Sequence, residues 1–233
     1  MQLTLLKATL PESAPGIVIH LGDVSLVLAE RGARLVIADP PWEYYQPQVA
    51  RDTERDYVEL PYYTLSHPEI IRTLDASWDA CGEDAYLLCW VTWPHFFAFV
   101  GALHAQPMRW RYVSGGAWSK TTGRGIGYHQ RGDSEPYLLF VKGSPGKPRE
   151  ALGNAPASPR GRNSEKPMPF LEDVMRAFTQ PGDLVLSVYS GLCPEARAAK
   201  RCGRRLVGAE IDPKRHADAL AYLAQTREGT HGR

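Results

Sequence analysis

Short apolar runs of strand length alternate along this chain with stretches of helical character. Strands are predicted at residues 35–38, 85–93, 109–118, 136–142, 184–188 and 205–211. Helices are predicted from Pro94 to about residue 104, from 166 to about 179, from 194 to 201, and from Asp212-Pro213 onward. Strands that alternate with helices predict an α/β fold that is doubly wound, with a mostly parallel sheet and helices on both faces.

The size and composition narrow the class of protein. A chain of 233 residues suits one domain, 1–233, and its 43% hydrophobic and 23% charged residues are ordinary for a globular protein. No apolar run approaches the ~20 residues that a membrane helix needs, and the N-terminal residues lack the pattern of a secretion signal. The four cysteines follow no metal-ligand spacing, so we expect free thiols, no metal site and a cytoplasmic protein.

Charge is unevenly distributed, although the net charge is only +1. Residues 105–166 contain 11 basic and 4 acidic residues, whereas residues 1–104 contain 6 basic and 14 acidic ones. The basic part can face the phosphates of a nucleic acid, or it can be a solvated surface that balances the acidic part. Residues 43–67 have the length of a functional or disordered loop, and residues 143–163 are rich in Gly, Pro, Ser and Arg. We expect insertions that face the substrate at about 43–67 and 120–163.

The tetrapeptide Asp39-Pro40-Pro41-Trp42, called the DPPW loop below, directly follows a predicted strand. Its prolines cannot continue a central strand, so Asp39 is expected at the strand's carboxyl end, where open parallel sheets bind ligands. They also remove two N–H donors, which leaves carbonyl groups and one carboxylate as acceptors for an amino group. The indole ring of Trp42 would offer a flat face for a base. The alternative interpretation is a plain turn followed by a tryptophan of the core.

Two further segments have features of a nucleoside site. Residues 184–193 combine a strand with a tight turn around Gly191, and Glu210 ends the next predicted strand. The turn lets the backbone approach a ligand, and the acid can bind ribose hydroxyls, although a plain βαβ unit fits equally well. Lys166 and Ser164 lie at the start of a predicted helix, where a carboxylate can bind; Ser164 can also simply cap that helix.

Together, the DPPW loop, the Ser164-x-Lys166-Pro167 element, the glycine turn and the Gly208-x-Glu210 strand end resemble the MT-A70-like amino-methyltransferases. These are relatives of the β-type DNA adenine methyltransferases. The resemblance covers roughly residues 20–225, and Asp39 precedes Ser187 by 148 residues, the order of a circularly permuted methyltransferase fold. It implies S-adenosylmethionine as cofactor and methylation of the N6 amino group of adenine, with DNA favoured over RNA as the nucleic-acid partner. A monomer and a homodimer both fit.

The resemblance also implies roles for individual residues. Asp39 and the Pro40 carbonyl would hold the target amine, Pro41 would keep the loop rigid, and Trp42 would stack on the base. Lys166 would pair with the cofactor's carboxylate and Glu210 with its ribose. The full implied cofactor-binding set is Asp23, Asp39, Ser164, Lys166, Ser187, Tyr189, Ser190, Gly191 and Glu210. We expect contacts to the substrate from Tyr44, Tyr45, Lys120, Arg124, His129 and Arg131.

One segment departs from the family pattern. Many DNA members read Asp-x-Phe-x-Gly-x-Gly where this chain has Ser187, Tyr189, Gly191 and Cys193, so the acid and the second glycine are absent. Three alternatives therefore stay open: adenine-N6 methylation of RNA, cytosine-N4 methylation of DNA, and a catalytically weak binding partner with the same fold. Cytosine enzymes of this type more often carry Ser at the position of Asp39, which favours adenine.

Overall fold

An eight-stranded sheet forms the centre of the structure, a computed structural model that describes residues 16–43, 63–122, 129–159, 161 and 165–225. Its strands are β1 (Ile17–Leu21), β2 (Ala33–Ala38), β3 (Cys81–Trp90), β4 (Arg111–Lys120), β5 (Ser134–Lys142), β6 (Ala157–Ser158), β7 (Leu184–Val188) and β8 (Arg205–Glu210). The helices are α1 (Ser25–Leu28), α2 (His67–Ala80), α3 (Trp93–Ala105), α4 (Met168–Phe178), α5 (Pro194–Cys202) and α6 (Pro213–Ala224). None of these helices has the length and apolar character needed to span a membrane.

The strands are ordered β1-β8-β7-β2-β3-β5-β4-β6, and among them only β5 runs antiparallel to its neighbours. The mostly parallel sheet predicted from the sequence is therefore confirmed. Because the other strands point the same way, the carboxyl ends of β2, β3, β4, β7 and β8 lie along one edge. The start of β5 lies at the same edge, so residues distant in the chain can meet there.

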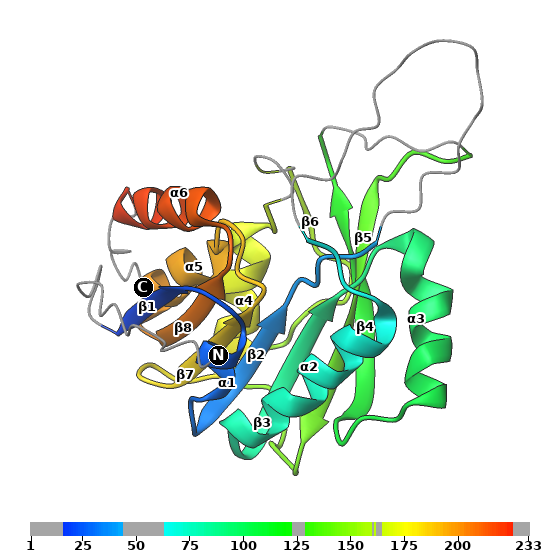
Figure 1. Cartoon of the computed structure of the whole chain (residues 1–233), viewed down its shortest axis with the longest axis horizontal. Helices are drawn as coiled ribbons and strands as arrows, with labels where there is room; N and C mark the ends of the chain where they lie inside the picture. The colour runs from blue at the N-terminus through cyan, green and yellow to red at the C-terminus, as the bar shows by residue number, and fades with distance from the viewer. Residues whose placement is uncertain (1–15, 44–62, 123–128, 160, 162–164, 226–233) are drawn as a thin grey trace, which may run out of the picture.

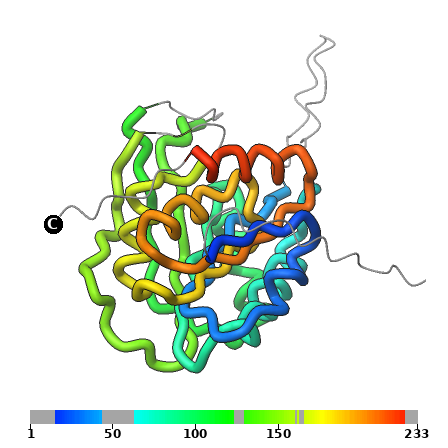
Figure 2. Tube along the Cα trace, turned by 90° about the vertical axis from the view of Figure 1, so that its left-hand side faces the viewer, coloured from blue at the N-terminus to red at the C-terminus, as the bar shows by residue number. Residues whose placement is uncertain are grey.

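Helices cover both faces of this sheet (Figure 1). Successive residues of β2 divide between the two sides: Leu35 and Ile37 belong to the core under α4, α5 and α6, whereas Val36 and Ala38 belong to the core under α1, α2 and α3. Figure 2 looks at the molecule from the side of β1 and α6, with a layer of helices on either side of the sheet. The predicted doubly wound arrangement is confirmed.

The sequence explains why these elements form where they do. All five residues of β7 are buried, which matches its nearly unbroken apolar sequence, because a central parallel strand is covered on both faces. α2 begins at a capping box in which the Glu69 carboxylate accepts the Ser66 N–H at 2.9 Å, and Pro68 lies in its first turn. α6 begins at Asp212, whose side chain accepts the Arg215 N–H at 2.8 Å, as predicted for a capping residue.

Some elements differ from the sequence-based expectation. β1, α1, α2 and β6 are absent from that prediction, and Gly22 and Asp23 directly follow β1. β3 begins at Cys81 rather than at residue 85, directly after α2. The strand predicted at 136–142 is β5, whereas β6, in the segment expected to be a loop, pairs with the end of β4. The predicted extent of β7 is confirmed.

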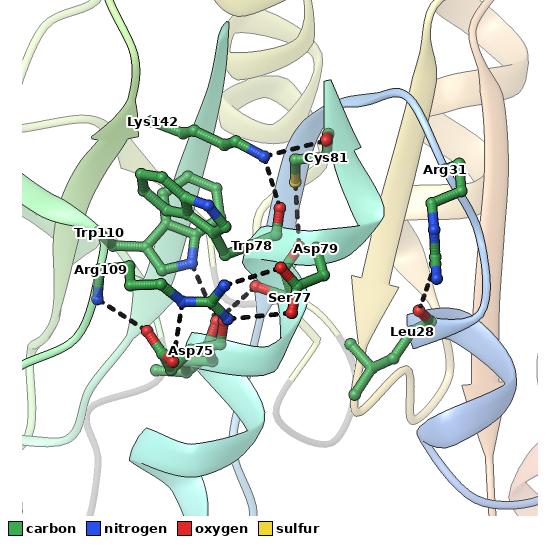
Figure 3. Close-up of polar contacts among 11 residues, drawn as sticks. Leu28, Arg31, Asp75, Ser77, Trp78, Asp79, Cys81, Arg109, Trp110 and Lys142 are labelled. Atoms are coloured by element: carbon green, nitrogen blue, oxygen red, sulfur yellow. Dashed lines mark hydrogen bonds and ion pairs between the residues drawn. The ribbon is translucent and has the colours of Figure 1, made fainter. Parts of the chain in front are cut away.

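Polar contacts tie the end of α2 to β4 and β5 (Figure 3). Arg109, just before β4, lies 3.1 Å from the carboxylate of Asp75 and 2.7 Å from that of Asp79. Lys142, at the end of β5, donates to the Trp78 carbonyl at 2.7 Å, and its ammonium group lies 4.9 Å from the centre of the Trp78 ring. Arg109 and Lys142 belong to the basic part of the chain, so these contacts engage two of the cations considered above for phosphate binding.

Candidate active site

β2 and β7 are neighbours at the point where the winding of the sheet reverses (Figure 1). The chain continues from β7 into α5 on one face, and from β2 it reaches α2 on the other face. In open α/β sheets such a switch point leaves a ligand crevice outside the carboxyl ends of the strands. Asp39 follows β2, and its N–H donates to the carbonyl of Val188 at the end of β7 at 3.4 Å. The DPPW loop and the glycine turn therefore meet at the switch point.

Backbone hydrogen bonds fix the DPPW loop. The Trp42 N–H donates to the Pro40 carbonyl at 2.9 Å, and the Leu65 N–H donates to the Pro41 carbonyl at 2.9 Å. A carbonyl oxygen has two lone pairs, so Pro40 can still accept one more donor. The Asp39 side chain is 34% exposed. The loop thus presents a carboxylate and a carbonyl, the acceptors expected from the sequence.

Trp42 is not the open stacking platform that the sequence suggested. Its side chain is 3% exposed and packs against His95, Phe99 and His67. The ring centroids lie 5.5 Å apart for the stacked pair with His95 and 5.0 Å apart for the edge-on pair with Phe99. The structure therefore corrects the expectation: Trp42 belongs to the core beneath α2 and α3 and anchors the loop. A base bound at this site has to stack on another surface.

A row of alternating charges begins at Asp39. The Nζ atom of Lys166 lies 2.7 Å from Oδ2 of Asp39 and 3.2 Å from Oε2 of Glu135. The other oxygen of Glu135, Oε1, lies 2.6 Å from Nζ of Lys120. Both lysine side chains are 8% exposed, and the Lys166 ammonium group lies 5.3 Å from the centre of the Trp90 ring. Charges this far withdrawn from water are tolerated because each is paired.

The pairing sets the protonation of the row. Burial raises the pKa of Asp39, because the opposing effect of Lys166 is the smaller one, and the negative charge of Glu135 adds to the rise. Burial alone would raise the pKa of Glu135, but the two lysines hold it below its ordinary value. Burial alone would lower the pKa of Lys166, yet the charges of Asp39 and Glu135 raise it. Lys166 is therefore a fixed cation beside a carboxyl group that takes up a proton more readily than usual.

The turn after β7 adopts left-handed backbone at three positions. Tyr189, Gly191 and Cys193 have φ values of 66°, 55° and 49°. For the two non-glycine residues this conformation costs about 1–3 kcal/mol each, and it persists only where the surroundings enforce it. The Ser190 N–H donates to the Ala209 carbonyl at 3.2 Å, and the Cys193 N–H donates to the Ser190 carbonyl at 2.7 Å. A β-carbon added at Gly191 would meet nothing within 4 Å, so the turn is open at that residue.

Ser187 and Ser190 form the buried base of this turn. The Ser190 hydroxyl donates to the Ser187 carbonyl at 3.1 Å, and Ser190 and Ser187 are 5% and 2% exposed, respectively. A β-carbon at Gly208 on β8 would lie 2.5 Å from the Ser190 hydroxyl oxygen. Gly208 is thus needed for the turn to approach β8. Ser187 itself ends inside the core and not as an exposed ligand group.

Glu210 and Asp23 lie beside the turn. The Glu210 carboxylate accepts the Gly191 N–H at 2.8 Å, while its backbone carbonyl accepts the Gly22 N–H at 2.9 Å. Asp23 is exposed, and its carboxylate accepts the Ser25 N–H at 2.8 Å at the start of α1. The structure therefore brings together the turn, the predicted ribose acid and the Gly22–Asp23 pair, as the sequence-based hypothesis requires.

Glu195 is a site residue that the sequence-based reasoning missed. It lies in the first turn of α5 and is 3% exposed, and its Oε2 atom has no hydrogen-bond partner among the described residues. Burial raises its pKa to about 7; the charge of Asp39 adds to the rise, while the ammonium group of Lys166 opposes it. A glutamate within the sequence Pro-Glu-Ala-Arg is typical of a first helical turn that is exposed to solvent. The burial of Glu195 is therefore apparent only from the fold.

The residues expected to contact the substrate are distributed differently from the prediction. Lys120 is not on a phosphate-facing surface: its ammonium group is buried against Glu135 and lies 5.6 Å from the Trp118 ring. The sequence does not reveal this contact, because Glu135 lies close to Lys120 only through the pairing of β4 with β5. His129 and Arg131 are exposed between these two strands. Tyr44, Tyr45, Arg124 and Ser164 lie outside the described residues.

Comparisons with known proteins were made for the sequence and for the fold. No family model matches the chain. A putative methylase, YubD of Escherichia coli (strain K12), is 24% identical over 224 residues, which are 93% of this chain and 85% of that protein.

Three solved structures share the fold. The M1.HpyAVI–SAM complex has a TM-score of 0.65 at 16% identity and covers 89% of this chain and 98% of its own. TTHA0409, a putative DNA modification methylase from Thermus thermophilus complexed with S-adenosyl-L-methionine, has a TM-score of 0.64 at 20% identity, covering 93% and 98%. The cytosine-N4-specific PvuII DNA methyltransferase has a TM-score of 0.63 at 11% identity, covering 91% and 94%. The chain therefore has the Rossmann-like fold of these methyltransferases.

Proposed function

We propose that this chain is an S-adenosylmethionine-dependent methyltransferase that modifies an amino group of a nucleobase in DNA, namely N6 of adenine. The observation that carries the proposal is the position of the DPPW loop. Asp39 and the Pro40 carbonyl stand at the carboxyl end of β2, next to a strained, open turn at the end of β7. Acceptors for an amine thus lie beside a turn suited to a nucleoside cofactor, at the switch point of a methyltransferase fold.

The groups around the crevice fit that cofactor. Glu210 offers carboxylate oxygens at the end of β8, and Lys166 offers an ammonium group for a carboxylate. Of the other contacts that the resemblance implies, Asp23, Tyr189, Ser190 and Gly191 lie in or beside the turn, Ser187 is buried beneath it, and Ser164 lies outside the described residues. Glu195 adds a buried carboxylate oxygen without a partner among the described residues, as expected where a ligand completes the site. When bound, the cofactor supplies an electrophilic methyl group on a sulfonium sulfur.

Asp39 and Pro40 would activate the target amine. An aryl amine is a weak nucleophile because its lone pair is delocalised into the ring. Hydrogen bonds from the two N–H groups to the Asp39 carboxylate and the Pro40 carbonyl favour a pyramidal nitrogen and increase its electron density. The same acceptors stabilise the positive charge that develops on the nitrogen. Lys166 already occupies Oδ2 of Asp39, so Oδ1 is the oxygen left for the amine.

Two properties of Asp39 support this role. Its pKa is raised, which suits a group that briefly accepts the amine proton before the proton leaves to solvent. Its position between Lys166 and the Val188 carbonyl restricts its movement, so that amine and methyl group can be aligned. Adenine is proposed because the loop carries Asp39 and not Ser. The MT-A70-like assignment remains part of the proposal, because no family model matches.

Mass spectrometry of nucleosides tests the proposal. The protein is incubated with S-adenosylmethionine and either DNA or RNA, and the nucleic acid is then digested. N6-methyladenine from DNA is the expected product. N4-methylcytosine would contradict the choice of base, and N6-methyladenine from RNA alone would contradict the choice of nucleic acid. Absence of any methylated base, with the cofactor bound, would favour a catalytically weak binding partner.

A further inference from the structure

Glu195 follows the segment in which the sequence departs from the family that it resembles. Many DNA members of that family carry an acid at the position of Ser187, the fourth residue of β7, and this chain has none there. Glu195 follows eight residues later, after the strained turn, and is 3% exposed. A carboxyl group buried in this way costs free energy unless a partner compensates it. α5 therefore supplies a buried acid directly after the turn, whereas β7 supplies none.

Glu195 lies close to groups from several elements that border the crevice. It senses the charges of Asp39 at the end of β2 and of Lys166 before α4, and the Ser187 hydroxyl of β7 interacts with its side chain. Cys193, at the start of α5, is the other titratable group beside it, and burial raises the pKa of that thiol to about 12. Cys193 therefore stays neutral near pH 7, and Asp39 and Lys166 are the charges that Glu195 experiences.

The charges in this region leave Glu195 without a cation of its own. Lys166 contacts Asp39 and Glu135, and Lys120 contacts Glu135, so these two acids share the two lysines, and Glu195 forms no ion pair among the described residues. Oε2 of Glu195 has no hydrogen-bond partner among those residues. A cation that donates hydrogen bonds would satisfy both the unpartnered oxygen and the charge of the ionised carboxylate. An ammonium group has three N–H donors, whereas a sulfonium centre has none.

We propose that Glu195 receives the ammonium group at the amino-acid end of the cofactor and so replaces the acid that is absent at Ser187. This inference rests on the proposed function, because it assumes that S-adenosylmethionine binds in the crevice. Lys166 would then hold the carboxylate of the amino-acid end, and Glu195 its ammonium group. Glu195 is a binding residue for the cofactor and does not touch the base.

Calorimetry with three ligands tests the inference. S-adenosylmethionine and S-adenosylhomocysteine both carry the ammonium group, and only the first has a sulfonium; 5′-methylthioadenosine has neither. Glu195→Gln is expected to weaken binding of the first two by about 10- to 100-fold and to leave the third unchanged. Glu172→Gln is the matched control, because Glu172 of α4 pairs with Arg201 of α5 at 2.9 Å away from the crevice. It is expected to bind all three ligands as the wild type does.

The wild-type protein provides a second readout that needs no variant. Glu195 has a pKa of about 7 without ligand, so its protonated form must lose a proton before it can bind an ammonium group. Affinity for S-adenosylmethionine is expected to rise from pH 6 to pH 8, with proton release at pH 6.5 detected as a buffer-dependent enthalpy. Proton uptake, or none, would overturn the inference even if Glu195→Gln failed to fold.

The outcomes separate this inference from the proposed function. If the wild type binds neither S-adenosylmethionine nor S-adenosylhomocysteine, the proposed function fails and the inference fails with it. If the wild type binds and Glu195→Gln binds equally well, only the inference fails. A loss confined to S-adenosylmethionine would mean that Glu195 senses the sulfonium and would also overturn it. An equal loss for 5′-methylthioadenosine would indicate general damage to the crevice and count against it too.

Discussion

Replacing Lys166 with methionine removes the cation between Asp39 and Glu135. Its Nζ atom is 2.7 Å from one carboxylate and 3.2 Å from the other, which at an effective dielectric constant of about 20 corresponds to about 6 and about 5 kcal/mol of gross attraction. Most of this offsets the cost of burying the charges, and losing one partner of a buried pair costs about 3–5 kcal/mol net. Because Asp39 is 34% exposed, we expect a loss of about 3 kcal/mol at pH 8.

The pH dependence of this loss distinguishes electrostatics from packing. In the wild type the lysines hold the pKa of Glu135 below its unfolded value of about 4.3, so its contribution to stability is present above that pH and is lost in acid. In Lys166→Met the folded-state pKa of both carboxyl groups is expected to lie above the unfolded values. For Glu135 the sign then reverses, and for Asp39, whose pKa is already raised in the wild type, the existing trend becomes stronger. The variant therefore loses stability as the pH rises through those folded-state values.

Urea unfolding at pH 5 and pH 8 measures the effect. The difference between wild type and Lys166→Met is expected to be larger at pH 8 than at pH 5 by about 1 kcal/mol or more. Methionine has a similar length and keeps an apolar contact with Trp90, so packing changes little. Adding Asp39→Asn to Lys166→Met removes one unpaired carboxylate and is expected to recover part of the loss. An equal difference at both pH values, without recovery in the double variant, would refute the electrostatic reasoning.

Two further substitutions test the packing around the site and beneath it. Gly208→Ala places a β-carbon 2.5 Å from the Ser190 hydroxyl oxygen, so we expect the free energy of unfolding, measured in urea, to fall by about 1–3 kcal/mol. Adding Ser190→Ala should recover this loss. If Gly208→Ala left the stability unchanged, the assigned contact would be contradicted. Trp110→Phe removes the 2.9 Å hydrogen bond from the indole N–H to the Leu74 carbonyl and should lower the free energy of unfolding by about 1–3 kcal/mol. Trp93→Phe, at a 50% exposed position, should lower it much less. Equal losses for the two variants would show that burial does not set the cost.

The sequence predicted the central part of the fold better than its edges. β7 is an apolar run between a Pro-Gly turn and a Ser-Gly turn, and its extent was predicted correctly. β1 is a five-residue edge strand whose identity depends on pairing with β8, which no local pattern reveals. α2 had a recognisable signal, because Ser66 and Glu69 form a capping box and Pro68 follows Ser66 by two residues.

The sequence predicted the candidate site residues that lie at the ends of strands, and it missed the contacts that depend on how the strands pair. Asp39 and Glu210 each end a strand, and the sequence located both. The partners of Lys166 and Lys120 are Asp39 and Glu135, which are distant in the chain and meet only through the order of the strands. The prediction for Trp42 was wrong because burial cannot be read from the residue type. A tryptophan can stack on a base, yet His67, His95 and Phe99 surround this one.

The most direct test of the account compares wild type with Asp39→Asn in two assays, methyl transfer to DNA and binding of S-adenosylmethionine. Asparagine keeps the size of the side chain but offers one acceptor oxygen and no charge. The account predicts that transfer to adenine N6 falls by at least about 100-fold, because acceptors for the developing charge are lost, while cofactor affinity changes by less than about tenfold. Transfer within about threefold of wild type would contradict the assignment of the DPPW loop as the catalytic centre.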